Sequence, residues 1–386
     1  MNAHFTRRHF LQTSAALAAS CGLPACLRAA EDPDLIVRQA EPHNAEPALA
    51  ALVAAPITPV KHFYVRSHGA VPKVEAAGFR LRIEGMVGKP VEYTLDELRQ
   101  KFKSQSLEAT LTCAGSRRLE MNRIKPVPGV QWTAGAIGHA RWTGAALAEV
   151  LRVAELKESA KHVWFDGLDP ITEKDGSIAP FGGSIPLERA LAAEAPPLLA
   201  YVMNDEPLTA AHGFPLRSVV PGYIGARSVK WLTKITLSDR PSPNHYVAAA
   251  YKVVRSDDKN ELAAAEPIYA NTINAAICTP GDEEKLTAGR QEVKGYALPT
   301  GESGCTVEKV ELSADGGKTW QTARLHGERR PLAWQLWSAS VDLVKGRQEL
   351  IVRATDSRGN TMPKECQWNA KGYLYNAWHR VSVEVA

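Results

Sequence analysis

The last third of the chain, from about Tyr251 onward, consists of short alternating segments separated by turn residues, with no helical pattern. In "HRVSVEV", Val381, Val383 and Val385 share one face of an extended strand, because the side chains of a strand alternate between its two faces. The stretch "VEKVELSADGGKTWQTARL" contains two such strands around an Asp-Gly-Gly turn. Few folds suit this pattern, and we predict a β-sandwich over residues 251–386.

The preceding part of the chain mixes strands with short helices. In "YTLDELRQKF", Thr94 and Glu97 have the spacing of a capping box at the start of a helix. The stretch "LEATLTC" alternates in the manner of a strand and places on one face Leu107, Ala109, Leu111 and Cys113. We therefore predict an α+β domain over residues 61–250. Residues 31–60, rich in Ala, Pro and Glu, are expected to form an extended arm.

The N-terminus has the pattern of an export signal. Residues 1–30 contain three arginines and no acidic residue, and two of these arginines, Arg7 and Arg8, are adjacent. Adjacent arginines followed by a short Ala/Leu stretch are typical of a twin-arginine signal peptide. We expect residues 1–30 to direct the protein to the periplasm by this route. The apolar run is too short to form a stable membrane span.

Charge and cysteine content narrow the range of partners. The chain has 46 basic and 42 acidic residues, and without its first 30 residues it is nearly neutral. This balance gives no support for a nucleic-acid partner. No C-x-x-C-H motif occurs, so no haem is expected to be attached to this chain. A disulfide between any two of Cys278, Cys305 and Cys366 is possible in an oxidising compartment.

The segment "TLTCAGSRR" places one thiol beside two fixed positive charges. A thiolate is a soft metal ligand, and neighbouring cations lower the pKa of a thiol. Arg117 and Arg118 could have that effect on Cys113, or they could bind an anion through their planar guanidinium groups. The segment alone favours a buried structural cysteine next to surface arginines, because lone cysteines are commonly inert.

Longer blocks around this segment resemble the sulfite oxidase family, including its bacterial periplasmic sulfite dehydrogenases. These blocks are "FYVRSH", "CAGSRRLEMNRIKPVPGVQWTAGAIGHARWTG", "GLD", "HGFPLRSVVPGYIGARSVKWL" and "NAWHR", and they follow one another in the family's order across roughly residues 60–386. The resemblance implies a molybdopterin-binding domain followed by an immunoglobulin-like dimerisation domain. It also implies Mo-molybdopterin as the cofactor and a homodimer as the assembly.

The resemblance implies roles for individual residues as well. Cys113 falls where the family supplies its protein thiolate to molybdenum. The positions that match cofactor contacts are Tyr64, Val65, Arg66, Ser67, His68, Asp169, His212, Arg217, Ser228, Val229 and Lys230. The positions that match the catalytic pocket above the metal are Arg66, Arg118, Trp132, Tyr251 and Arg380.

Taken singly, most of these residues have ordinary structural explanations. Trp132 suits a hydrophobic core, and Asp169, before Pro170, suits a turn. Arg380 alternates away from the valine face, which is typical of a solvated strand residue. Tyr246 competes with Tyr251 for the role of active-site tyrosine. The combined pattern favours the functional assignments.

The resemblance implies the oxidation of sulfite to sulfate, with electrons passed to an external carrier such as a c-type cytochrome. Two alternatives stay open from the residues alone. One is another periplasmic molybdopterin enzyme, of the methionine sulfoxide or nitrate reductase type, because an arginine-rich pocket suits several anions. The other is a non-catalytic exported β-sandwich that binds a partner.

Overall fold

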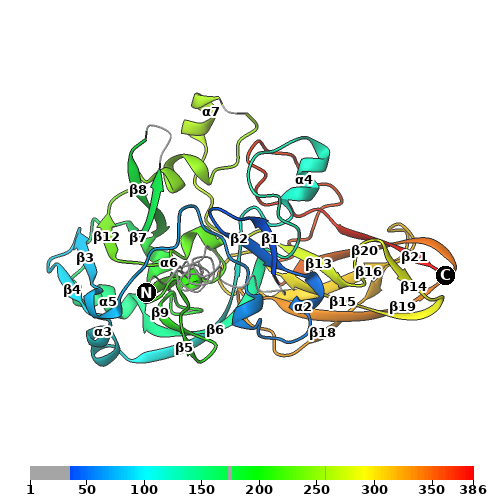
Figure 1. Cartoon of the computed structure of the whole chain (residues 1–386), viewed down its shortest axis with the longest axis horizontal. Coiled ribbons are helices and arrows are strands. Elements are labelled where there is room, and N and C mark those ends of the chain that lie inside the picture. The colour runs from blue at the N-terminus through cyan, green and yellow to red at the C-terminus, as the bar shows by residue number, and fades with distance from the viewer. Residues whose placement is uncertain (1–34, 173–175, 257) are drawn as a thin grey trace, which may run out of the picture. The chain divides into compact units, whose positions relative to one another are not determined.

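The computed structural model describes residues 35–172, 176–256 and 258–386 (Figure 1). The predicted signal peptide over residues 1–30 lies outside the described residues. Within the described parts, no helix is long and apolar enough to cross a membrane.

The described chain begins with a small antiparallel hairpin and not with the extended arm predicted for residues 31–60. Strand β1 (Leu35–Gln39) pairs with β2 (Asn44–Pro47), and the short helix α2 (Leu49–Leu52) follows. All four residues of β2 are buried. The expectation of an arm was wrong because burial against the rest of the protein outweighs the weak strand propensity of this Ala- and Glu-rich segment.

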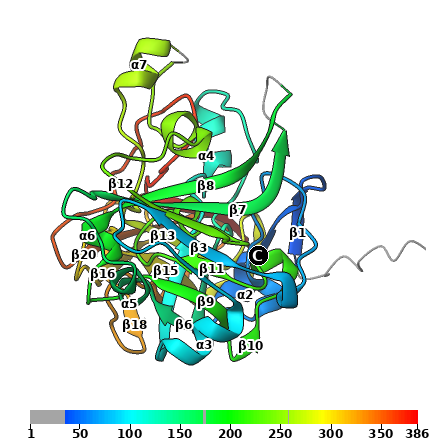
Figure 2. The same cartoon turned by 90° about the vertical axis from the view of Figure 1, so that its left-hand side faces the viewer.

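Two sheets form the α+β part. The first has the order β10 (Glu206–Pro207), β9 (Leu198–Met203), β6 (Ile137–Ala146), β5 (Ser104–Thr112), with β11 (Arg217–Val219) also paired to β9. The second has the order β4 (Val91–Tyr93), β3 (Leu81–Gly85), β12 (Lys234–Ser238), β7 (His162–Thr172), β8 (Ile178–Pro186). Figure 2 shows β7, β8 and β12 running side by side. The mixture of strands and short helices predicted for this part is confirmed.

Short helices and turns connect these strands. They are η1 (Val60–His62), η2 (Ala76–Gly78), α3 (Leu95–Lys101), α4 (Arg118–Ile124), α5 (Leu147–Val153), α6 (Leu187–Ala190), η3 (Ala210–His212), η4 (Gly225–Arg227), η5 (Tyr246–Ala250) and α7 (Lys259–Ala264). The predicted capping box of α3 is confirmed: the Thr94 hydroxyl accepts from the Glu97 backbone amide, and the Glu97 carboxylate accepts from the Thr94 amide.

The C-terminal part is the predicted β-sandwich, drawn in yellow to red in Figure 1. One sheet has the order β13 (Asn274–Thr279), β15 (Gly289–Leu298), β19 (Gln335–Leu343), β18 (Arg324–His326). The other has the order β14 (Glu284–Leu286), β21 (His379–Val385), β20 (Gly346–Asp356), β16 (Val307–Ser313), β17 (Gln321–Thr322). Val381, Val383 and Val385 are buried in the core between the sheets, as their alternation predicts. None of the four cysteines in the described residues forms a disulfide.

The sandwich and the α+β part share a hydrophobic seam. Ala134 and Ile137 from one side pack in the same cluster as Tyr296 and Trp334 from the other. The Tyr296 hydroxyl donates to the Ala134 carbonyl at 2.8 Å, so the polar end of this buried ring is satisfied. Burial on this scale stabilises one arrangement of the two parts.

Arg117 is the polar anchor of the seam and is completely buried. Its guanidinium forms an ion pair with Glu120 at 2.7 Å and donates to the Ala377 carbonyl and to Asn274 Oδ1, at 2.7 and 2.8 Å. Its backbone φ of 63° lies in the left-handed region, so the turn after Cys113 is held in a conformation that costs a non-glycine residue energy. The sandwich contacts of the side chain offset that cost.

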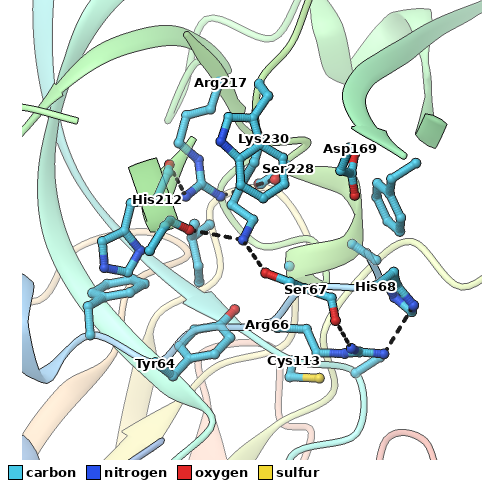
Figure 3. A pocket seen from close by; sticks show the side chains of 18 of the residues that line it. Tyr64, Arg66, Ser67, His68, Cys113, Asp169, His212, Arg217, Ser228 and Lys230 are labelled. Carbon is cyan, nitrogen blue, oxygen red and sulfur yellow. Dashed lines mark hydrogen bonds between the residues drawn. The ribbon is translucent and has the colours of Figure 1, made fainter. Parts of the chain in front are cut away.

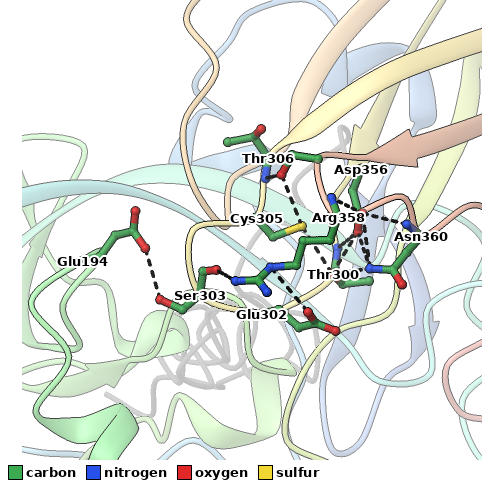
Figure 4. Close-up of polar contacts among 10 residues, drawn as sticks. Glu194, Thr300, Glu302, Ser303, Cys305, Thr306, Asp356, Arg358 and Asn360 are labelled. Carbon is green, nitrogen blue, oxygen red and sulfur yellow. Dashed lines mark hydrogen bonds and ion pairs between the residues drawn. The ribbon is translucent and has the colours of Figure 1, made fainter.

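A second polar contact between the two parts lies in the loop before β16 (Figure 4). The Ser303 hydroxyl donates to Glu194 of the α+β part at 3.1 Å. The buried carboxylate of Asp356, the last residue of β20, accepts from Thr300 of the loop and from Asn360. The contact with Thr300 attaches the loop to the end of β20.

We predict that Arg117→Met lowers the free energy of unfolding by about 3–5 kcal/mol, because it leaves the Glu120 carboxylate without its buried partner. Urea denaturation measures this change. The control is Arg347→Met, which removes an exposed ion pair with Glu283 and should cost under about 1 kcal/mol. Equal stability of the two variants would show that Arg117 does not anchor the seam.

Candidate active site

A deep pocket in the α+β part collects residues from seven separated segments of the chain (Figure 3). Its lining comprises Phe63, Tyr64, Arg66, Ser67, His68, Leu111, Cys113, Ala114, Asp169, Phe181, Ala211, His212, Arg217, Gly225, Ala226, Ser228, Lys230, Trp231 and Tyr251. In the view of Figure 3, Cys113 and Arg66 lie at one end of the pocket and Arg217 at the other. The pocket thus separates a thiol end from a strongly cationic end.

Cys113 lies where β5 ends, and it is 7% exposed. The alternation along β5 turns its side chain toward the same side as Leu111, which also lines the pocket. The Gly115 amide donates to Cys113 Sγ at 3.4 Å. A Cβ at Gly115 would lie 2.5 Å from Arg118 Nη2, so a larger residue there would displace the Arg118 guanidinium.

The cationic end contains more positive than negative charge. Arg217 donates to the carbonyls of His212 and Ser228, at 3.1 and 3.0 Å. The Lys230 ammonium donates to Ser67 Oγ and to the Ala211 carbonyl, at 3.0 and 2.9 Å. These acceptors are neutral, so they solvate the cations without balancing their charge.

The pKa shifts show that burial disfavours the charged forms of these side chains. Burial, reinforced by Arg217, lowers the pKa of Lys230 to about 7. Burial also lowers the pKa of Arg217 to about 10, and burial with the nearby cations lowers the pKa of His212 to about 3. The carboxyl in this part of the lining is Asp169, whose own pKa is raised by burial.

Asp169 brings an acceptor that the protein itself does not use. It lies in β7 where the register with β8 shifts between Asp166 and Pro170, which places it in the pocket lining. Its Oδ1 is buried and has no hydrogen-bond partner among the described residues. The carboxylate oxygen lacks a hydrogen-bond donor, and the cations lack a matching anion. Together they require a ligand that supplies a donor and a negative charge.

These observations fit a pterin cofactor with a phosphate group. Arg217 and Lys230 suit the phosphate, Asp169 suits an N–H edge of a ring, and the Cys113 thiolate suits a soft metal. Gly225 allows the close approach of Tyr64, because a Cβ there would lie 2.6 Å from the tyrosine hydroxyl. The donor set therefore matches the group that the sequence resemblance implies.

At the thiol end, Arg66, His68 and Tyr251 form a hydrogen-bonded chain. Arg66 Nη2 lies 3.1 Å from His68 Nδ1, and His68 Nε2 lies 2.8 Å from the Tyr251 hydroxyl. A guanidinium can only donate, so Nδ1 accepts and the imidazole proton is on Nε2. Burial and then Arg66 hold the pKa of His68 well below its usual value, which keeps the ring neutral. The Tyr251 oxygen accepts from His68, and its own proton is available to a ligand.

The tyrosine that lines the pocket is Tyr251 and not its competitor Tyr246. Burial raises the pKa of Tyr251, so its hydroxyl stays protonated at neutral pH. Tyr246 packs behind His68, with ring centroids 4.3 Å apart. Phe181, which lies in β8, stacks on the His68 ring, with the ring centroids 5.1 Å apart. No sequence pattern indicates this contact.

Arg118 and Trp132 lie just outside the pocket lining. Arg118 is 5% exposed and donates to the carbonyls of Val130 and Gly372, at 3.0 and 3.3 Å. Its guanidinium lies 5.0 Å from the Tyr373 ring, which in turn stacks on Tyr251. Trp132 is completely buried in a cluster with Tyr64 and Cys113, so it packs behind the pocket.

Arg380 is not brought to the pocket. It lies on the outer face of β21 and forms an ion pair with Glu349 at 2.8 Å. The expectation that it reaches the α+β part is corrected here, because strand alternation points it to solvent. The sandwich segment that does approach the site is Gly372–Leu374: Leu374 donates to the Ala114 carbonyl at 2.8 Å. This segment has no periodicity, so no sequence pattern indicates its contacts.

Two of the expected cofactor contacts act through the backbone. Val65 pairs with Ala45 of the hairpin. The Val229 amide donates to Ser218 Oγ at 2.7 Å, and its carbonyl accepts from the Ser218 amide. Neither valine lines the pocket, but both hold neighbours that do. The other nine expected cofactor contacts all belong to the lining.

Comparison with known proteins agrees with this geometry. The family models described as "Oxidoreductase molybdopterin binding domain" and "Mo-co oxidoreductase dimerisation domain" match residues 68–246 and 265–386. The chain is 41% identical to the sulfite oxidase of Gallus gallus over 361 residues, which cover 90% of this chain and 77% of that protein. It is 38% identical to the sulfite oxidase of Arabidopsis thaliana over 377 residues, or 92% and 94% of the two proteins.

A solved structure has the same fold across nearly the whole chain. The sulfane dehydrogenase SoxCD from Paracoccus pantotrophus superposes with a TM-score of 0.77 at 24% sequence identity, covering 96% of this chain and 94% of that chain. The α+β domain and the β-sandwich are therefore parts of one known two-domain architecture.

We predict that Lys230→Met stabilises the cofactor-free protein, compared with the unsubstituted cofactor-free protein, and that this gain is larger at pH 6 than at pH 9. Above pH 7 the folded protein has lost the Lys230 proton while the unfolded chain retains it up to about pH 10.4. The unsubstituted protein should therefore gain stability as the pH rises from 7, by at most about 1.4 kcal/mol per pH unit.

Chemical denaturation of both proteins between pH 6 and 9 measures this difference. In cofactor-loaded protein, an anionic partner should abolish the pH-dependent gain. Parallel stability curves for the two cofactor-free proteins would contradict the lowered pKa of Lys230.

Proposed function

Because this chain belongs to the sulfite oxidase family of molybdopterin oxidoreductases, we propose that it oxidises sulfite to sulfate in the pocket around Cys113. The observation that carries the proposal is the thiol of Cys113 beside Arg66, at the end of the pocket opposite Arg217. Tyr251 belongs to the same lining and is hydrogen-bonded to His68. When bound, the molybdenum cofactor would supply the two-electron oxidation and the oxygen transfer.

The cofactor would be held mainly by charge. Arg217 and Lys230 would pair with its phosphate, and Asp169 would accept from its ring system. Ser228 lines the same end of the pocket and is fixed there by a hydrogen bond from the Val220 amide to its hydroxyl, at 2.9 Å. Cys113 would provide the thiolate ligand to the metal.

Arg66 and Tyr251 would bind the substrate anion. Sulfite carries one or two negative charges near neutral pH, and a charge-assisted hydrogen bond contributes about 1.5–3 kcal/mol. Arg66 would supply such a bond, and Tyr251 would donate its proton because its oxygen already accepts from His68. Arg118 would add a fixed positive charge one layer behind them, next to Tyr373.

Neutral His68 has a separate task in this proposal. It orients the Tyr251 hydroxyl and keeps its proton directed away from the imidazole. Trp132 would limit the size of the site indirectly, because it packs behind Tyr64 and Cys113. Arg380 has no part in the proposed chemistry.

The proposal extends to partners and location. A match to a dimerisation domain over residues 265–386 supports a homodimer. The two electrons gained in each turnover would leave to an external one-electron carrier such as a c-type cytochrome, without a haem in this chain. We also propose export to the periplasm, on the basis of the twin arginines in residues 1–30.

We predict that the purified protein reduces ferricytochrome c in a sulfite-dependent manner, and that Cys113→Ser lowers this turnover by at least about a hundredfold. The matched control is Cys305→Ser, which changes a buried thiol of the sandwich and should leave turnover intact. Molybdenum content is measured on all three proteins.

Three outcomes would contradict the proposal. Near-normal turnover of molybdenum-loaded Cys113→Ser would remove the thiolate assignment. Turnover with nitrate or methionine sulfoxide and none with sulfite would favour the reductases. A complete lack of molybdenum in protein made together with its own maturation system would favour a non-catalytic binding module.

A further inference from the structure

The N-terminal hairpin contributes a buried polar residue that touches the anion-binding arginine. Asn44, the first residue of β2, is completely buried. Its Oδ1 accepts from Arg66 Nη1 at 3.0 Å and from the Ser67 backbone amide at 2.9 Å. The residue lies before the matched family region, which begins at residue 68, and it does not line the pocket itself.

The orientation of the Asn44 amide is fixed by its own donors. Nδ2 donates to the Pro42 carbonyl at 2.8 Å and to Gln39 Oε1 at 3.4 Å. Arg66 and the Ser67 amide can only donate to Asn44, so the oxygen of the amide must face them. The hairpin turn therefore holds the oxygen of Asn44 toward the active site.

Backbone pairing joins the hairpin to the same segment. Ala45 and Val65 exchange both hydrogen bonds, at 3.0 and 2.8 Å. Ser67 is held from the opposite side by Lys230, which donates to its hydroxyl. The segment that carries Arg66 is thus held by the N-terminal hairpin and by Lys230 at the cationic end of the pocket.

These contacts decide which edge of Arg66 faces a ligand. Its two Nη1 hydrogens are used by Asn44 Oδ1 and the Ser67 carbonyl, and one Nη2 hydrogen by His68. The Nε–H and the second Nη2–H make no hydrogen bond to the described residues. Arg66 lines both the pocket and an outer groove bounded by residues 37–39 and 129–131, so its side chain lies where the two cavities meet.

We propose that Asn44 is a positioning residue for the anion site, because it holds Arg66 with two N–H donors turned toward the incoming sulfite. This inference rests on the proposed function for its substrate. An arginine side chain has many rotamers, and fixing one of them before the anion arrives removes an entropic cost from binding. Without Asn44, Arg66 would bind the anion more weakly and without a fixed direction.

The test compares Asn44→Ala with a matched variant of the same hairpin. Glu46→Gln breaks the ion pair of Glu46 with Arg38 at 2.6 Å but leaves the contacts of Arg66 intact. Four quantities are measured on cofactor-loaded protein: the KM and the kcat for sulfite, the Kd for sulfate from the rise in Tm with sulfate, and the molybdenum content. The sulfate titration reads anion binding without turnover.

For Asn44→Ala we expect the KM for sulfite and the Kd for sulfate to rise about tenfold, equivalent to about 1.4 kcal/mol. Its kcat should change less than about threefold, because Tyr251 and Cys113 are untouched. Glu46→Gln should lower Tm while both constants stay within about twofold of the unsubstituted protein. Molybdenum content should be equal in all of them.

Asn44→Asp provides a second variant if Asn44→Ala does not fold. It keeps both accepted hydrogen bonds and adds a negative charge beside Arg66, so it should weaken sulfate binding at low and at high salt, because salt screens a buried contact only weakly. Normal sulfate binding by this variant at low salt would overturn the inference.

Two results with the alanine variant would also overturn it. One is an unchanged KM and sulfate Kd in Asn44→Ala, and the other is a rise of equal size in Glu46→Gln, which would indicate general loosening of the hairpin. Failure of the proposed function is distinguishable, because the unsubstituted protein would then bind sulfate with no oxidation of sulfite.

Discussion

The structure depends on burying several cations around one pocket with too few carboxylates to balance them. Arg217 is buried and Lys230 is partly buried, and burial raises the pKa of the Asp169 carboxyl. An arrangement of this kind is unfavourable in a protein without a ligand, and it becomes favourable when an anion enters. We infer that the pocket is built for the cofactor first and that the substrate site is an extension of it. The thiol of Cys113 marks where the two sites meet.

The two consecutive arginines after Cys113 show how the sandwich supports this site. Arg117 turns into the seam and binds Glu120 and the sandwich backbone, whereas Arg118 turns toward the pocket and binds the Gly372 carbonyl. The left-handed conformation at Arg117 separates the two directions. The second domain therefore fixes the turn that follows Cys113, in addition to any part it has in forming a dimer.

Local patterns in the sequence predicted much of the fold. Alternation placed Cys113 on the buried face of its strand and Val381 in the sandwich core, and the capping box located helix α3. Family resemblance located most of the pocket lining, because its motifs are long. Neither could locate contacts between distant segments. The role of Asn44 depends on a hairpin with little strand propensity, and the approach of Tyr373 depends on an irregular loop. The motif around Arg380 predicts a place in the pocket, but the alternation of its own strand directs the side chain to solvent.

The central claim is that the pocket holds a molybdenum cofactor through the Cys113 thiolate, with its phosphate at Arg217 and Lys230. Anomalous diffraction from crystals of the cofactor-loaded protein, recorded at the molybdenum absorption edge, tests this most directly. The account predicts one strong peak at bonding distance from Cys113 Sγ, on the side that faces Arg66 and Tyr251, and density for a phosphate at the opposite end of the pocket. A peak bound elsewhere, or a loaded protein in which the phosphate avoids Arg217 and Lys230, would contradict it.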